Sequence, residues 1–255
     1  MMKQLLLLTA FLYAGLAQAQ KFITSGTIEF EVKTNLQKSL SSVAWDDDDN
    51  SFFKQIIASQ PQFTVNYYKY SFSDNKANYI FDRNADTKKV SPWLSNINED
   101  DLWYSDYTNK KFANLKAIDD NYLITGDLKN VEWKLYPNDN TQIAGFNCRR
   151  ASTILFDSVY VFAYYTDEIA ISGGPMSVNG LPGMILGLTI PRMYTSWIAT
   201  TLTLDKPEIK EPIKGKKKTE AELQILLTDL AKSRIKEWGK NSAKWMNQMI
   251  WRTFL

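Results

Sequence analysis

Short segments with a period of two recur along most of this chain, and they predict a mainly β fold. In Lys21–Thr34 the apolar residues Ile28, Phe30 and Val32 alternate with polar neighbours, which is typical of a strand with one buried face. Consecutive strands joined by short turns pair antiparallel, so we expect a curved sheet, an open half-barrel or a sandwich. The expected strands are 21–34, 62–72, 77–82, 103–108, 111–113, 122–124, 132–136, 141–144, 149–156, 159–166, 184–191 and 194–204.

The sequence before residue 141 also predicts a turn and a short helix. Pro137–Asn140 is rich in turn-forming residues and predicts a turn. Asp46–Asn50 precedes an apolar run, which favours a short helix over about 48–59, since acidic side chains cap a helix N-terminus. The same acidic run does not fit a calcium-binding loop, because Ser51 stands where that loop has Gly and Ile57 where it has Glu.

The C-terminal part predicts a linker followed by a helical tail. Lys206–Lys218 is polar and contains proline, which is typical of a linker. Thr219 and Glu222 form a capping-box pattern, and apolar residues at helical spacing continue over 219–253. Residues 206–255 hold twelve Lys or Arg against six Asp or Glu, so a basic tail follows an acidic body. The tail's apolar face either packs on the β domain, 20–205, or contacts a membrane surface or a partner.

The N-terminus has the pattern of an export signal. Lys3 precedes the apolar run Leu5–Leu16, and a small-residue cleavage pattern ends at Ala19. The run is shorter than the roughly 20 residues of a membrane span. We therefore expect a signal peptide over 1–19, cleavage between Ala19 and Gln20, and a periplasmic or extracellular protein without a transmembrane span. An uncleaved anchor is the alternative.

Ile171–Leu188 is dense in glycine and proline and also apolar. It holds five of the eleven glycines and two of the eight prolines. Linkers are polar, so this composition predicts a tightly turned, largely buried loop that leads into a strand at about 184–190. The same loop could instead contact a ligand or a partner. The candidate contact residues are Gly174, Pro175, Met176, Gly180, Leu181, Pro182, Gly183 and Met184.

Three motifs resemble the GLPGLI family of exported Bacteroidetes proteins. Gly180–Leu186 reads GLPGMIL, with Met184 where the family name has Leu. Ile143–Ala151 and Ala163–Ile171, which leads to Gly174-Pro175, stand in the family's order. The resemblance covers about residues 20–200 and implies an envelope protein without an agreed biochemical activity.

The composition excludes several chemistries. The chain has no histidine, which removes Ser-His-Asp and Cys-His catalysis and histidine-based metal sites. Cys148 is the single cysteine and is expected to be a small buried residue, with a reactive thiol as the alternative. Phosphate-binding glycine motifs are missing, so we expect no nucleotide cofactor. With no histidine and one cysteine, we also expect no metal. The expected export also argues against a nucleic-acid partner.

Two functions remain open. The first is non-enzymatic binding of an apolar ligand, or of an outer-membrane or other envelope partner, through a concave aromatic face or the glycine-rich loop. By analogy, curved sheets of periplasmic lipoprotein carriers hold an apolar guest in this way. The second is a carboxylate-dependent hydrolase that uses Asp167 or Glu168. Adjacent residues of a strand point to opposite faces, which argues against the second. A purely structural role in an outer-membrane assembly is a further alternative.

Overall fold

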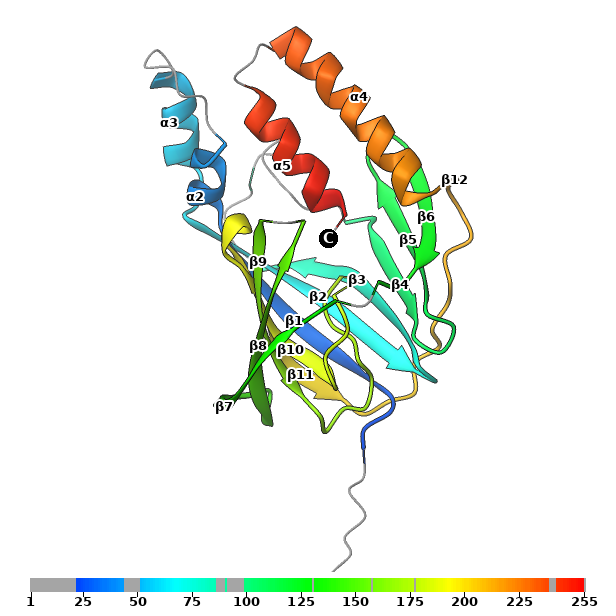
Figure 1. The fold of residues 1–255 in the computed structure, drawn as a ribbon. Coiled ribbons are helices and arrows are strands. Elements are labelled where there is room, and N and C mark those ends of the chain that lie inside the picture. Colours follow the sequence, from blue (N-terminus) through cyan, green and yellow to red (C-terminus); the bar gives the residue numbers. More distant parts are fainter. Residues whose placement is uncertain are drawn as a thin grey trace, which may run out of the picture.

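One curved sheet forms the body of the protein. The computed structural model describes residues 22–43, 51–85, 90, 99–129, 131–156, 158–176, 178–238 and 242–254. Twelve strands lie in the order β12-β6-β5-β4-β3-β2-β1-β11-β10-β9-β8-β7, and every pair is antiparallel except β12 with β6. The sheet is strongly curved (Figure 1). The strands are β1 Gly26–Asn35, β2 Phe63–Ser73, β3 Lys76–Asn84, β4 Leu102–Asp106, β5 Lys111–Ala117, β6 Asn121–Asp127, β7 Lys134–Ile143, β8 Phe146–Leu155, β9 Val159–Thr166, β10 Met184–Ile190, β11 Thr195–Thr203 and β12 Lys216–Lys218.

The alternation seen in the sequence separates the two faces of this sheet. On β1, Ile28 and Phe30 are fully buried, whereas their neighbours Glu29 and Glu31 are partly exposed. On β2, Tyr70 and Phe72 follow the same rule. The inward residues of both strands join one hydrophobic core with those of β9 and β10. The prediction of a mainly antiparallel, curved β fold is therefore confirmed.

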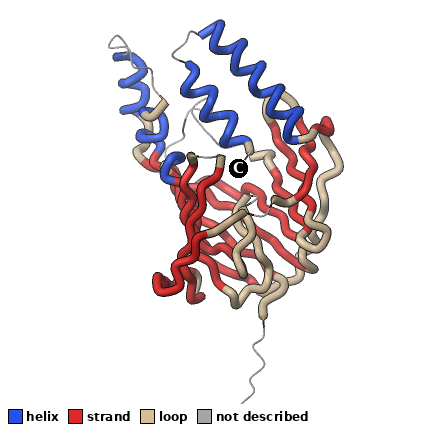
Figure 2. Tube along the Cα trace, in the orientation of Figure 1, coloured by secondary structure: helices blue, strands red, loops and turns tan. Residues whose placement is uncertain are grey.

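The helices lie together on one side of the sheet (Figure 2). Figure 1 shows α4 and α5 above the curved sheet, with α2 and α3 beside them. Helix α2 follows β1 directly and was not predicted, because six residues are too few for a clear helical period. The helices are α2 Leu36–Ser41, α3 Ser51–Ser59, α4 Glu220–Trp238 and α5 Ala243–Thr253, with a short 3₁₀ turn at Pro191–Met193.

Three segments differ from the expectation. The predicted turn Pro137–Asn140 lies inside β7, where the register shifts between Tyr136 and Asn140, so its turn residues form a bulge in an edge strand. The end of the expected linker forms β12, which pairs with β6. Helix α3 begins at Ser51, and the acidic run Asp46–Asn50 before it lies outside the described residues.

The helical tail packs on the body. Leu223 and Leu227 of α4 are 1% exposed and contact Phe112, Tyr122 and Ile124 of β5 and β6. The capping box is formed, since Glu222 accepts from the Thr219 amide at 2.7 Å and its own amide donates to the Thr219 hydroxyl at 3.2 Å. Among the described residues, no helix is both long and apolar enough to cross a membrane.

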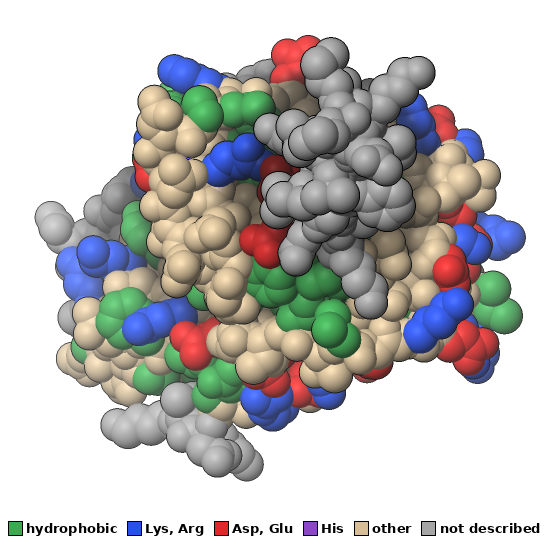
Figure 3. Space-filling model, turned by 90° about the horizontal axis from the view of Figure 1, so that it is seen from below, with side chains coloured by type: hydrophobic (Ala, Val, Ile, Leu, Met, Phe, Trp, Pro, Cys, Tyr) green, Lys and Arg blue, Asp and Glu red, His purple; other side chains and the backbone are tan. Residues whose placement is uncertain are grey.

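Part of the basic tail is balanced by acids of the body. Lys216 forms an ion pair with Asp120, which raises the pKa of Lys216 and lowers that of Asp120. The Lys206 ammonium lies 3.9 Å from the carboxylate of Asp74, which also belongs to the body. On the side away from the helices, basic and acidic side chains lie next to one another around the rim (Figure 3). The charge asymmetry of the sequence is thus partly satisfied within the chain.

Candidate functional site

Two neighbouring chambers lie between the sheet and the helices. The outer chamber has a volume of about 1390 Å³ and the inner chamber about 490 Å³. Lys116 of β5 and Thr253 of α5 line both chambers. Ligand pockets in proteins commonly measure about 300–1,000 Å³, so the two together offer room for a sizeable ligand.

The outer chamber lies between the two ends of the sheet. The chain leaves β6 on one side and reaches the opposite edge strand, β7, through residues 128–133. Two hydrogen bonds attach this connection to β8 and to the glycine-rich loop. The Thr153 hydroxyl donates to the Glu132 carbonyl at 2.7 Å, and the Trp133 indole donates to the Asn179 carbonyl at 2.9 Å. Other walls come from α4 and α5. Its apolar lining includes Phe112, Ile124, Leu155, Leu223, Ile250 and Phe254.

The inner chamber has an aromatic floor. Tyr68 and Tyr79 stack with their ring centroids 4.9 Å apart and their planes within 7°, and Tyr79 meets Trp103 edge-on at 5.4 Å. Trp197 of β11 also lines this chamber. Burial raises the pKa of the Tyr68 and Tyr79 phenols, so both stay uncharged at neutral pH. The floor is therefore aromatic and uncharged, and it is built from inward positions on the curved sheet.

A buried ion pair stands at the boundary of the two chambers. The Lys116 ammonium donates to the Asp101 carboxylate at 3.2 Å and lies 3.7 Å from the centroid of the Trp103 ring. The other Asp101 oxygen accepts from the Ala117 amide at 3.0 Å. Burial lowers the pKa of Lys116, and the nearby Asp101 charge opposes that shift. Lys116 is only 4% exposed, so this is a charged group held in the interior.

Helix α5 covers the inner chamber. Its residues Trp245, Gln248, Met249 and Arg252 line the chamber opposite the aromatic floor. The Arg252 guanidinium donates to the Ser39 hydroxyl of α2 at 3.0 Å, and burial lowers the pKa of Arg252 to about 10. Trp245 packs against the apolar cluster formed by α2 and α3. Arg252 and Trp245 therefore connect α5 to the neighbouring helices α2 and α3.

The glycine-rich loop lies inside the curved sheet, and its predicted burial is confirmed. Met176, Leu181 and Met184 are buried in the main core, and β10 begins at Met184 as expected. Gly174, Pro175 and Gly183 are buried as well, while Gly180 and Pro182 are exposed. Met176 is the one of these eight candidate contact residues that lines a chamber, the inner one, and its neighbours Val178 and Asn179 line the outer one. The loop thus supports the wall of the chamber.

Gly183 is required for steric reasons. Its φ of +137° lies in a region that favours glycine, and a Cβ there would lie 2.0 Å from the Thr166 carbonyl oxygen. Gly173 is also tightly enclosed, since a Cβ would lie 2.2 Å from the Tyr70 hydroxyl and 2.4 Å from that of Tyr107. Those two hydroxyls hydrogen-bond to each other at 2.8 Å. The glycines let the loop pack against the sheet.

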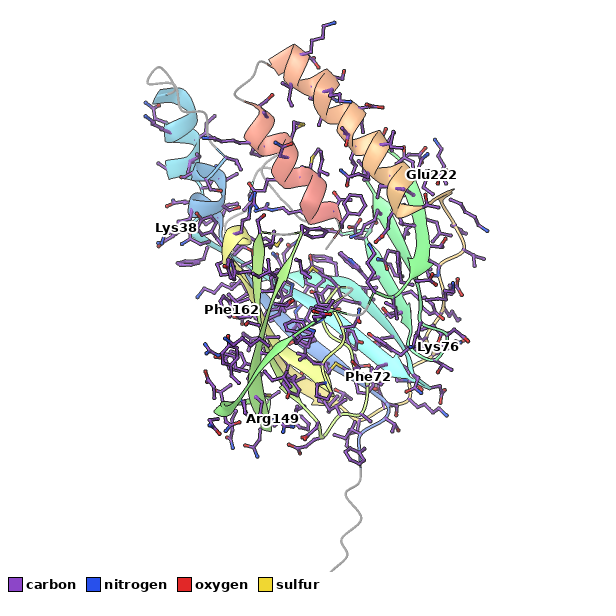
Figure 4. All side chains as sticks on the ribbon, in the orientation of Figure 1. Lys38, Phe72, Lys76, Arg149, Phe162 and Glu222 are labelled. Carbon is purple, nitrogen blue, oxygen red and sulfur yellow. The ribbon has the colours of Figure 1, made fainter. Side chains whose placement is uncertain are left out.

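The candidate acids and the cysteine lie outside both chambers. Asp167 is exposed and forms an ion pair with Arg149, near the end of the sheet that is away from the helices (Figure 4). Neither Asp167 nor Glu168 lines a chamber. Cys148 is fully buried, and burial raises its pKa to about 11, so its expected role as a small core residue is confirmed. No group of three possible metal-binding side chains occurs among the residues that the structure describes.

Neither Lys116 nor Asp101 was predicted from the sequence as part of a site. The predicted strand ended at Ala113, four residues before β5 ends at Ala117. Its extension would have placed Lys116 on the same face as Phe112 and Asn114, which is an unusual position for a charge. Asp101 could not be assigned as its partner, because the register that pairs Leu102 with Leu115 depends on the tertiary fold.

Comparisons with known proteins give a partial family match and a likeness in fold. Residues 111–187, less than half of the chain, match the model of a Bacteroidetes-associated family described as "Protein of unknown function (Porph_ging)". The comparison with curated proteins gives no match.

Two solved structures of one protein resemble this chain. "Structure of PNGF-II in P21 space group" has a TM-score of 0.52 and 12% identity, over 80% of this chain and 33% of that one. "Structure of PNGF-II in C2 space group" has a TM-score of 0.49 and 13% identity, over 89% and 33%. The chain therefore spans about a third of the length of that protein. At this identity the likeness shows the fold alone.

Proposed function

We propose that this protein binds an apolar or amphipathic small molecule in the chambers between its sheet and its helices, without catalysis. The observation that carries the proposal is the outer chamber, about 1390 Å³ in volume, in which apolar side chains from β5, β6, β8, α4 and α5 lie beside polar and charged ones. A concave, mostly apolar pocket with a few polar groups is the usual form of a ligand site. The aromatic floor of the inner chamber extends the same surface.

The proposal also includes a cellular location. The N-terminal pattern of Lys3, Leu5–Leu16 and Ala19 supports export to the periplasm or beyond. We infer that the chain belongs to the GLPGLI family, because the motif at Gly180–Leu186 lies within the matched residues 111–187. A carrier or sensor of an apolar molecule in the cell envelope fits both inferences.

The experiment is native mass spectrometry of the mature protein purified from its own envelope fraction, followed by organic extraction. We expect an apolar molecule to co-purify with a defined stoichiometry. A fluorescent apolar probe measures the same site in the emptied protein. Gln224→Trp places an indole ring at the outer chamber and should weaken probe binding, whereas Ile225→Trp, on the same helix but outside the lining of both chambers, should leave it unchanged.

The outcomes separate this proposal from the alternatives. Equal binding by the Gln224 and Ile225 variants would contradict the outer chamber as the site. Absence of any bound molecule and of probe binding would favour a protein partner in the envelope, which a pull-down with the mature chain would identify. Loss of an esterase or glycosidase activity in Asp167→Asn would favour a hydrolase instead.

A further inference from the structure

The Lys116–Asp101 pair has unused hydrogen-bonding capacity at the boundary of the two chambers. An ammonium group has three N–H donors. One Lys116 donor binds Asp101, and the Trp103 ring lies against the ammonium group. Among the described residues, Asp101 is the single side chain that accepts a hydrogen bond from Lys116. A donor therefore remains for a group inside the chambers.

Asp101 also retains accepting capacity. A carboxylate offers about four lone-pair positions. The structure gives the Asp101 carboxylate two hydrogen bonds, one from Lys116 and one from the Ala117 amide. Its side chain is 14% exposed, and it lines the inner chamber. A ligand at this point thus meets a donor and an acceptor next to each other.

The charges of the pair decide which kind of group fits there. Lys116 and Asp101 neutralise each other, so a charged ligand group of either sign gains little net attraction from the pair and still loses its hydration. A neutral group with an acceptor and a donor side by side satisfies both without a new buried charge. Arg252 also lines the inner chamber and donates to Ser39. Because its guanidinium is positively charged, an anionic head group is the strongest alternative to a neutral one.

On these grounds we propose that Lys116 and Asp101 bind the uncharged polar head group of an amphipathic ligand, whose head offers a hydrogen-bond acceptor and a donor side by side. The ligand's apolar chain then occupies the outer chamber. This inference rests on the proposed function, since it assigns a ligand class to the same site. The nearby aromatic side chains Trp103, Tyr79 and Trp197 cover the head group from water.

The test compares four probes that share one alkyl chain: lauroyl glycerol, methyl laurate, dodecanoate and dodecylammonium. Each competes with the fluorescent probe bound to the emptied full-length protein. Lauroyl glycerol should bind about tenfold more tightly than each of the others, because only it is neutral and supplies both a donor and an acceptor. The double variant Lys116→Met with Asp101→Asn should lose that preference. Lys111→Met, an exposed lysine on the same strand, should keep it.

Each outcome is decisive. If dodecanoate or dodecylammonium binds wild-type protein as tightly as lauroyl glycerol, the assigned head group is wrong, although apolar binding stands. Equal preference in the double variant and the wild type would likewise overturn the role of the pair. If no probe binds at all, the proposed function itself fails. The wild-type series decides the question even if the double variant does not fold.

Discussion

Gly183→Ala tests whether the GLPG motif serves the packing of the loop. The residue has a φ of +137°, and a conformation of this kind costs a residue with a Cβ about 1–2 kcal/mol. The new methyl group would also lie 2.0 Å from the carbonyl oxygen and 2.7 Å from the carbonyl carbon of Thr166, which are backbone atoms that cannot rotate away. Overpacking of this type costs about 1–3 kcal/mol. Together the two effects should lower the free energy of unfolding by about 2–5 kcal/mol.

The assay is urea unfolding followed by tryptophan fluorescence. With a slope of about 3 kcal/mol per M urea, the midpoint should fall by about 0.7–1.7 M. Gly145→Ala is the matched control, because Gly145 also has a positive φ, +85°, but its added Cβ would meet no atom within 4 Å. It should lose only about 1–2 kcal/mol. Equal midpoints for the two variants would refute the steric argument. Normal stability of Gly183→Ala with loss of a binding partner would favour a contact role for the loop.

Three further predictions concern the cysteine, the helix cap and the buried pair. Because burial raises the pKa of Cys148 from 9.0 to about 11, its thiol should react roughly a hundredfold more slowly with a disulfide reagent at pH 8 than in urea; equal rates would contradict its burial. The unfolded thiol loses its proton before the folded one, so stability should fall between pH 9 and 11, and Cys148→Ala should lose this contribution. Thr219→Ala should lower the free energy of unfolding by about 1 kcal/mol and speed amide exchange in the first turn of α4, while Thr228→Ala should leave that turn unchanged. Lys116→Met alone should lower the free energy of unfolding by about 3–5 kcal/mol, because it leaves the largely buried Asp101 carboxylate without its cation. Adding Asp101→Asn should recover part of that loss. Additive losses in this double-mutant cycle would show that the pair is not coupled.

Much of the local structure followed from short-range patterns. The residue period identified β9 at its true bounds, 159–166, and the start of β10 at Met184. The capping pattern located the start of α4, since Thr219 and Glu222 need only be three residues apart to bond. The glycine-rich loop was predicted to be buried because its apolar residues could not remain in water. These features depend on neighbours in the sequence, and the sequence alone determined them.

The candidate site depended instead on pairings between distant segments. Val131 and Trp133 reach Asn179 and Gly180 only because the sheet curves and the chain crosses from β6 to β7. Lys116 meets Asp101 through the register of β4 and β5, and α5 covers both because α4 first docks on β5 and β6. Strand order, curvature and helix docking are set by the sum of many long-range contacts, each weak by itself. The sequence therefore determined which segments are strands and what they bury, whereas the tertiary structure decided where a hollow remains and which side chains face it.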